Sequence, residues 1–368
     1  MGRGQRALAC LEGAPVIGVT SDFWRGRRVF VTGHSGFFGG WLTLWLTHLG
    51  ADVTGYSLAP PTRPNFFNAV GLAEGIASIT GDIRKLNFLS AAMRECDPQI
   101  VIHLAAQPLV REAFASPIET FSTNVMGTVN VLQAMRGCDN LDAAVIFTTD
   151  KVYENTETGT GYREDARLGG REPYGASKAC SEIAVEAYRQ SYFDRGVPVA
   201  TVRAGNIIGG GDWSADRIVP DAVRAFGGGH ALKIRNPDAV RPWQHALDPA
   251  RGVLLLTEKL VADKSAPACW NFGPTDENAV TVGTVADIMT KLWGNGASWE
   301  TTATPNAPYE AKLLGLDSSL AQARLGWQPN WSLERALNAT VDWYQGFLAR
   351  KDMRALSLAQ ITAMQGVN

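Results

Sequence analysis

A glycine-rich turn between an apolar strand and a helix constrains the fold of this chain more than any other feature. Residues 27–32 (RRVFVT) end in a β-branched apolar run, and residues 33–39 (GHSGFFG) follow with a GxxGxxG spacing. In such a turn Gly33 permits a tight bend, Gly36 lets the backbone approach a pyrophosphate, and Gly39 lets the helix pack close to the strand. The helix N-terminus favours the negative charge of phosphate. The context predicts a dinucleotide site, with a plain strand–helix turn as the alternative.

Apolar strands and helical segments alternate from this turn to about residue 203. We expect strands at residues 27–32, 52–56, 76–80, 99–104, 143–148 and 199–203. We expect helices at residues 40–49, 88–94, 119–136 and 174–193. Buried parallel strands read as apolar runs joined by crossover helices. The pattern predicts an α/β fold with a Rossmann-like, doubly wound parallel sheet.

The second half of the chain changes character after Gly205. Glycine, proline and tryptophan become frequent, and the expected elements are shorter, with helices near residues 282–292 and 333–349. We therefore expect an N-terminal extension at 1–22 and a dinucleotide-binding domain at 23–204, to which 238–268 return. Residues 205–237 and 269–356 should form a smaller C-terminal substrate-binding lobe.

Charge and composition exclude several classes of partner. The formal net charge is −2 and no basic run is longer than residues 25–28, so a nucleic acid partner is not expected. No apolar run reaches the length of a membrane span. The apolar stretch within residues 1–22 is broken by Glu12, Gly13 and Pro15, so it lacks the core of a secretion signal. We expect a cytoplasmic protein.

Cysteine and histidine usage predicts neither disulfides nor a metal site. The five cysteines are an odd, scattered set without a CxxC pair, which fits free thiols in a reducing compartment. The five histidines show no HExxH or His-x-His spacing.

A tyrosine and a lysine four residues apart are the first catalytic candidates. Tyr174 and Lys178 fall on one face of an expected helix. A tyrosine with its ordinary pKa near 10 is a poor base at neutral pH. A neighbouring ammonium and an oxidised nicotinamide ring would favour the phenolate. The pair predicts removal of a hydroxyl proton while hydride leaves the same carbon.

Three polar residues follow an expected buried strand, where ligand sites of α/β sheets form. Thr149 would hydrogen-bond a substrate oxygen, Asp150 would donate a proton to a leaving hydroxyl, and Lys151 would remove the proton next to a transient ketone. Lys151 must be neutral to do so, which needs burial or nearby positive charge. The alternative is a polar strand end that caps the next turn.

The residues alone leave the choice between NAD and NADP open. The end of the second strand, near Tyr56 and Ser57, carries no acid for the ribose hydroxyls, and Arg63 lies close enough in sequence to reach a 2′-phosphate. Asp82 after the third strand is either an adenine contact or a helix N-cap.

With these motifs in view, the chain resembles the extended short-chain dehydrogenase/reductase superfamily. Within it, the chain looks like the CDP-glucose 4,6-dehydratases from about Trp24 to near Leu356. The stretches that carry the resemblance are GWLTLWL (40–46), GYSLAPPTRPNFF (55–67), GDIR (81–84), HLAAQPLVR (103–111), STNVMGT (122–128), TTDKVYEN (148–155), VRAGNIIGGGDW (202–213), DRIVPD (216–221), IRNPDAVRPWQH (234–245) and WNFGP (270–274). Other nucleotide-sugar 4,6-dehydratases typically carry Asp-Glu where this chain has Asp150-Lys151, and related epimerases carry small hydroxyl residues there.

The resemblance implies a reaction, a cofactor and an assembly. The reaction would turn CDP-glucose into CDP-4-keto-6-deoxyglucose, with NAD retained through the cycle, in a homodimer or homotetramer. Cofactor contacts are implied for Gly33, Gly36, Phe37, Phe38, Gly39, Asp82, Ile83, Leu104, Ala105, Ala106, Thr123, Tyr174 and Lys178. Substrate contacts are implied for Gln107, Asn206, Arg217 and Arg241. The arginines suit a diphosphate because guanidinium binds phosphate bidentately; surface ion pairs are the alternative for both.

Three positions depart from the pattern of the family. Its glycine loop usually reads GHTGFKG, whereas Ser35 and Phe38 stand here for the threonine and the lysine. Loss of that positive charge could weaken or alter cofactor binding. Arg171 stands where an aromatic residue is common, so a shifted substrate remains open. Another epimerase, reductase or dehydratase on the same scaffold is the first rival, and a non-catalytic NAD-binding scaffold is the second.

Overall fold

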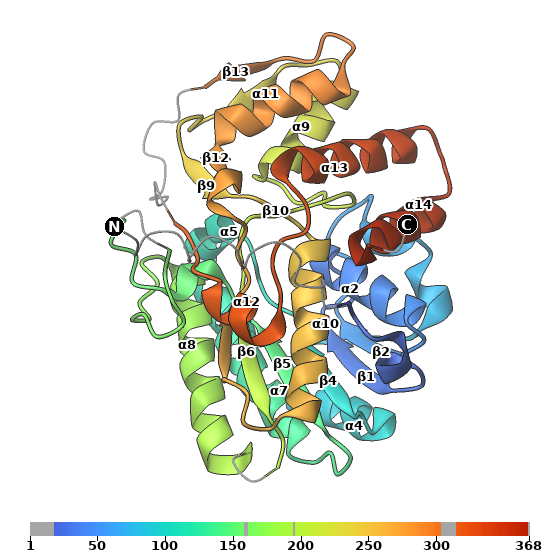
Figure 1. Cartoon of the computed structure of the whole chain (residues 1–368), viewed down its shortest axis with the longest axis vertical. Helices are drawn as coiled ribbons and strands as arrows, with labels where there is room; N and C mark the ends of the chain where they lie inside the picture. The colour runs from blue at the N-terminus through green and yellow to red at the C-terminus, as the bar shows by residue number, and fades with distance from the viewer. Residues whose placement is uncertain (1–17, 158–160, 194–195, 303–313, 367–368) are drawn as a thin grey trace, which may run out of the picture.

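A parallel sheet with helices on both faces forms the larger part of the computed structural model (Figure 1). The structure describes residues 18–157, 161–193, 196–302 and 314–366. Within these residues, seven parallel strands run in the order β11-β6-β5-β4-β1-β2-β3. They are β1 (Arg28–Thr32), β2 (Asp52–Ser57), β3 (Ala77–Thr80), β4 (Ile100–His103), β5 (Ala143–Phe147), β6 (Val199–Arg203) and β11 (Cys269–Asn271). The expected doubly wound α/β fold is confirmed.

The alternation of side chains along each strand explains why helices cover both faces. Val29 and Val31 of β1 pack into one core, and Phe30 between them packs into the other. The first core includes α2 (Phe37–His48) and α10 (Leu247–Ala262). The second includes α4 (Leu86–Cys96), α7 (Gly127–Met135) and α8 (Pro173–Tyr188).

Two of the expected helices contain π-helical turns. The helix expected at 119–136 is α6 (Pro117–Phe121), the π-turn η2 (Ser122–Met126) and α7 in direct succession. The helix expected at 174–193 is α8 followed by the π-turn η4 (Arg189–Phe193). The remaining short helices of this part are α1 (Ser21–Trp24), α3 (Phe66–Ala69), η1 (Leu72–Gly75), α5 (Val110–Ala115) and η3 (Asp150–Val152).

A smaller group of elements lies over the carboxyl ends of the strands, at the top of Figure 1. Its strands pair two by two: β7 (Ile207–Ile208) with β10 (Gln244–His245), β8 (Leu232–Ile234) with β13 (Trp299–Thr301), and β9 (Val240–Pro242) with β12 (Ala279–Thr281). Its helices are α9 (Ile218–Gly227), η5 (Asp276–Asn278), α11 (Val282–Trp293) and α13 (Leu333–Leu348). The helices α12 (Ser319–Leu325) and α14 (Met353–Gln365) contact α10.

The structure corrects the expected boundaries in three places. Residues 269–271, expected in the smaller lobe, are strand β11 and pair with β6 in the main sheet. Residues 240–245, expected to return to the first domain, form β9 and β10 and pair with strands of the smaller lobe. The extension expected at 1–22 lies mostly outside the described residues, but Thr20 already bonds to the α10 carboxylate of Glu258, at 2.9 Å. None of the described helices is long and apolar enough to cross a lipid bilayer.

Candidate active site

The turn between β1 and α2 has no room for a side chain at two of its positions, Gly33 and Gly39. Gly33 has a φ of +80°, and a Cβ there would lie 2.7 Å from the amide nitrogen of Ala105. A Cβ on Gly39 would lie 2.1 Å from the carbonyl oxygen of Gly33. Gly36 is the N-cap of α2 and no side chain caps that helix, so its first amides are open to a ligand. The turn therefore fits the pyrophosphate of a dinucleotide.

Phe38, which replaces the lysine common in the resembling family, packs inside the protein. Its ring centroid lies 4.6 Å from that of Phe147, the last residue of β5. Both residues line the cavity described next. The substitution thus places an apolar ring in the cavity wall at the position where the family usually has a lysine ammonium.

A cavity of about 830 Å³ opens at the carboxyl ends of the strands, between the sheet and the smaller lobe. Most of the expected site residues line it: Phe37, Phe38, Leu104, Ala106, Thr149, Lys151, Tyr174, Lys178, Asn206, Arg217 and Arg241. Parallel strands end at one edge of their sheet, which is why segments far apart in the sequence meet there.

Tyr174 and Lys178 face the cavity from the first turns of α8. Glu172 caps this helix, since its carboxylate accepts the amides of Tyr174 and Gly175 at 2.6 and 2.7 Å. The Lys178 ammonium donates to the carbonyl oxygen of Phe147 at 2.8 Å. The helix cap and this hydrogen bond fix both side chains relative to the end of β5.

Burial decides the charge of both groups. It lowers the pKa of Lys178 to about 8, against an opposing contribution from Glu182. It raises the pKa of Tyr174 to about 12, although hydrogen bonding with Thr149 opposes the shift. In the protein alone, burial outweighs the contributions that favour the phenolate of Tyr174. Tyr174 is a phenol at neutral pH until a further positive charge enters the cavity.

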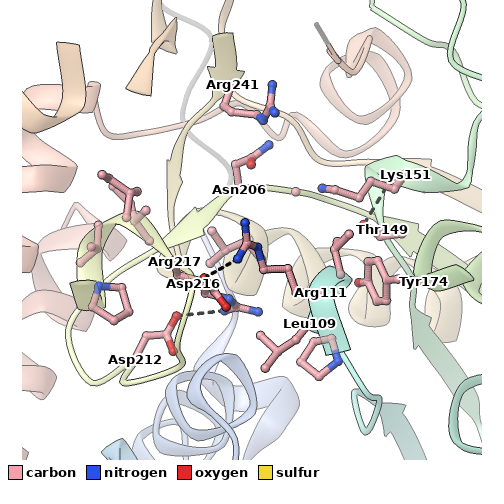
Figure 2. A pocket seen from close by; sticks show the side chains of 18 of the residues that line it. Leu109, Arg111, Thr149, Lys151, Tyr174, Asn206, Asp212, Asp216, Arg217 and Arg241 are labelled. Atoms are coloured by element: carbon pink, nitrogen blue, oxygen red, sulfur yellow. Dashed lines mark hydrogen bonds and ion pairs between the residues drawn. The ribbon is translucent and has the colours of Figure 1, made fainter. Parts of the chain in front are cut away.

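The short turn Asp150–Val152 follows the end of β5, and Figure 2 shows Thr149 and Lys151 on it or next to it. Thr149 is the N-cap of this turn, and its hydroxyl donates to the Asp150 carboxylate at 2.9 Å. Asp150 is fully buried, and the Lys151 ammonium lies 3.3 Å from it. Asn206 donates to the same carboxylate at 3.4 Å. The structure thus brings together a hydroxyl, a buried carboxylate and an amine that reaches the cavity.

Five arginines line the same cavity: Arg111, Arg171, Arg217, Arg235 and Arg241. Arg217, at the N-cap of α9, pairs with the buried carboxylate of Asp212 at 2.9 Å (Figure 2). Arg111 and Arg235 share Asp216, at 3.3 and 2.8 Å. The surface ion pair weighed for Arg217 is thus a pair inside the cavity, and the guanidinium groups there can meet an anionic ligand.

Several expected site residues do not line the cavity: Gly33, Gly36, Gly39, Asp82, Ile83, Ala105, Gln107, Thr123 and Asp150. The Gln107 amide donates to Leu109 O and to the Thr120 hydroxyl, at 3.1 and 2.9 Å. Asp82 is held by Arg84, and Ile83 is buried in the second core. Asp82 does not cap α4 either, because the N-cap of that helix is Lys85.

The sequence patterns did not point to Arg111, Arg235, Asp216 or Glu172 as site residues. A signal existed for Arg111, which follows the carboxyl end of β4 and closes the stretch HLAAQPLVR. Glu172 directly precedes the helix that carries Tyr174, where capping residues stand. Nothing in the sequence indicates that Asp216 joins arginines from two distant elements.

The comparisons with known proteins agree with this geometry. The family described as GDP-mannose 4,6 dehydratase matches residues 30–340. A CDP-glucose 4,6-dehydratase of Salmonella typhimurium is 46% identical over 351 residues, covering 94% of this chain and 98% of the relative. A dTDP-glucose 4,6-dehydratase of Xanthomonas campestris is 26% identical, covering 85% of this chain and 92% of the relative.

Solved structures show the same fold. A double mutant of the dTDP-glucose 4,6-dehydratase of Streptomyces venezuelae, with NAD and DAU bound, has a TM-score of 0.76 at 25% identity, covering 88% of this chain and 99% of that chain. The UDP-glucuronic acid 4-epimerase of Bacillus cereus, in complex with UDP-glucuronic acid and NAD, has a TM-score of 0.75 at 22% identity, covering 87% and 99%. Because the family match spans most of its length, the chain belongs to the GDP-mannose 4,6 dehydratase family.

Proposed function

We propose that this protein is an NAD-dependent hydro-lyase that converts CDP-glucose into CDP-4-keto-6-deoxyglucose. The observation that carries the proposal is the buried Asp150 carboxylate, 3.3 Å from the Lys151 ammonium, next to a cavity that Thr149, Lys151 and Tyr174 line. An acid and a base in contact are what removal of water requires. The choice of CDP-glucose follows the relative of that activity, which is 46% identical over 94% of this chain.

NAD is the cofactor that the cavity and the relatives support. The glycine turn admits a pyrophosphate, and Phe37, Phe38, Leu104 and Ala106 line the adjoining wall of the cavity. Arg63, on which the NADP alternative rests, is exposed and lies outside the cavity lining. When bound, NAD supplies the oxidant that takes a hydride from sugar C4 and later returns it to C6.

In the first step, Tyr174 removes the proton of the C4 hydroxyl. Thr149 donates a hydrogen bond to the same oxygen and so orients it. The Lys178 ammonium, held by the carbonyl of Phe147, favours the phenolate electrostatically. The C4 carbon becomes a ketone, which acidifies the hydrogen on C5.

In the second step, water leaves across C5 and C6, and Asp150 and Lys151 supply both proton transfers. A proton that passes from the Lys151 ammonium to the Asp150 carboxylate leaves a neutral amine and a neutral acid in contact. The amine then accepts the C5 proton while Asp150 protonates the departing C6 hydroxyl. At the end Lys151 is an ammonium and Asp150 a carboxylate, and Lys151 then returns its proton to C5. The cycle closes when Tyr174 releases the proton of the C4 hydroxyl to solvent and the Lys151 amine takes one up.

The pH profile should carry the signature of Lys178. Its pKa lies near 8, so the ammonium is present below that pH and is lost as the pH rises through it. We expect kcat/KM to fall on the alkaline side with an apparent pKa near 8. In Lys178→Arg the side chain stays charged, so kcat/KM should fall only at a higher pH than in the wild type, although its maximal value is lower. Steady-state rates across pH measure both; identical alkaline limbs in the two proteins would contradict the role of Lys178.

Gly205 should be indispensable for the position of Asp150. A Cβ at residue 205 would lie 2.0 Å from the Asp150 carboxylate oxygen, so Gly205→Ala must displace that side chain. We expect kcat to fall by about 10²-fold, since misplacement by about 1 Å has that effect. Gly227→Ala is the control, because a Cβ there meets nothing within 4 Å. Equal rates in the two variants would remove Asp150 from the mechanism.

The test of the activity itself needs no added cofactor. Purified protein is incubated with CDP-glucose, and the masses of the products are measured by mass spectrometry. Loss of one water per molecule supports dehydration with retained NAD. Activity only after NAD is added would mean that the cofactor dissociates during purification. Phe38, in place of the lysine, would then be the first candidate for the weaker binding of NAD. A reaction with dTDP-glucose or GDP-mannose but not with CDP-glucose would overturn the nucleotide and keep the chemistry.

We also propose a homodimer or homotetramer in the cytoplasm. Exposed apolar side chains gather on α5, α6, η2 and α8: Phe114, Ile118, Phe121, Met126 and Ile183. Such a patch is typical of a protein interface. The described cysteines Cys96, Cys138, Cys180 and Cys269 are free thiols, in keeping with a reducing compartment. We further propose that the chain consists of a dinucleotide-binding part and a substrate-binding part, and that β11 belongs to the dinucleotide-binding part.

A further inference from the structure

A buried ion pair lies beneath the turn Asp150–Val152, which we call the catalytic turn. No step of the proposed reaction uses this pair. Glu182 stands on α8, four residues after Lys178, and Arg203 ends β6. Two contacts join them, Nε to Oε1 at 3.0 Å and Nη2 to Oε2 at 2.9 Å, and both side chains are 4% exposed. A pair at this depth costs desolvation free energy unless further hydrogen bonds satisfy it. Its other partners are therefore informative.

Glu182 holds the residue that precedes the catalytic turn. The hydroxyl of Thr148 donates to Glu182 Oε1. Thr148 is 3% exposed, follows β5 directly and borders the cavity, but its hydroxyl is turned inward to Glu182 and the carbonyl of Val202. Thr149, next in the chain, faces the cavity (Figure 2).

Arg203 holds the residue that follows the catalytic turn. Its Nη1 donates to the Tyr153 hydroxyl at 2.8 Å. That hydroxyl in turn donates to Asn271 Oδ1 of β11 at 2.7 Å, and the Tyr153 side chain is 1% exposed. Tyr153 comes directly after the turn Asp150–Val152.

We propose that the Glu182–Arg203 pair positions the acid and the base of the elimination, a role that rests on the proposed function. The pair forms hydrogen bonds with the side-chain hydroxyls of Thr148 and Tyr153, the two residues that flank residues 149–152. A single helical turn at the end of a strand has little rigidity of its own, and general acid–base groups lose efficiency when misplaced by about 1 Å. Thr148, Tyr153, Glu182 and Arg203 are thus positioning residues, which act through Asp150 and Lys151.

The test removes one hydroxyl at a time, because Glu182→Gln would leave a buried cation uncompensated and can unfold the protein. The variants are Thr148→Val and Tyr153→Phe. The matched control is Thr201→Val: the Thr201 hydroxyl donates to Glu182 Oε2 at 2.7 Å, but Thr201 lies within β6 and does not border the turn. Thermal unfolding midpoints, kcat, KM and the near-ultraviolet absorbance of bound reduced nicotinamide are measured for all three.

We expect kcat to fall by about 10-fold in Thr148→Val and in Tyr153→Phe, with KM unchanged. Reduced nicotinamide should accumulate during a single turnover, because only the elimination is slowed. Thr201→Val should lose similar thermal stability and keep the wild-type kcat. If the three variants share one kcat and none accumulates reduced nicotinamide, the pair only stabilises the fold and the proposal is overturned. A wild-type protein that does not turn over CDP-glucose overturns the proposed function, and the positioning role falls with it.

Discussion

Replacing Tyr174 with phenylalanine is expected to reduce turnover of CDP-glucose by about 10³-fold, within the range of a lost acid–base group. The variant keeps the ring that fills the buried site at the start of α8 and loses only the hydroxyl. Because that hydroxyl acts before any other group, the whole cycle stops at its first step. No reduced nicotinamide should form in a single turnover, and the substrate should be recovered without loss of water.

The control for this variant is Tyr188→Phe on the same helix. The Tyr188 hydroxyl bonds to Gln133 at 3.3 Å and lies outside the cavity lining. It should turn over at the wild-type rate. Residual turnover of Tyr174→Phe within about tenfold of the wild type would show that another group takes the C4 proton. Lys178 would then be the first candidate, since it stands on the same face of the helix.

The sequence was sufficient for the elements with a clear local pattern. The expected strands end within one residue of those observed, because all but the mostly exposed edge strand β3 are largely buried apolar runs bounded by polar or glycine residues. The glycine turn and the Tyr174–Lys178 spacing also follow local rules, so their places in the fold were predictable. The meeting of Thr149, Tyr174 and Asn206 at one cavity follows from the fold class, since all three come after parallel strands.

The remaining features depend on contacts between distant segments. Strand β11 has three residues, Cys-Trp-Asn, too few for a period to be visible, and it forms because β6 offers it an edge. Asn206 has a φ of 48°, and only the tertiary structure aims its side chain at Asp150. The raised pKa of Tyr174 reflects complete burial, which a spacing of four residues does not report.

Replacing Asp150 with asparagine should separate the two halves of the reaction. Asparagine has the same shape, and its single amide oxygen can keep the hydrogen bond that Thr149 donates to Asp150 Oδ1 at 2.9 Å. The longer bond from Asn206 to Oδ2, at 3.4 Å, is lost because the amide nitrogen stands there. It cannot protonate the departing hydroxyl, and it cannot take a proton from Lys151. We expect overall turnover to fall by about 10²- to 10³-fold while oxidation at C4 persists. Bound reduced nicotinamide should therefore accumulate, which absorbance in a single turnover measures.

Asp248→Asn is the control that separates chemistry from stability. Asp248 is as fully buried as Asp150, but it lies on α10 and accepts a hydrogen bond from Asn330, not from Thr149, so the same substitution there should leave turnover unchanged. Thr148→Val and Tyr153→Phe should show the same accumulation as Asp150→Asn in weaker form, because they displace the acid without removing it. An undiminished overall rate in Asp150→Asn would exclude this residue as the acid. Loss of turnover without accumulation would instead place Asp150 in the first step, beside Tyr174.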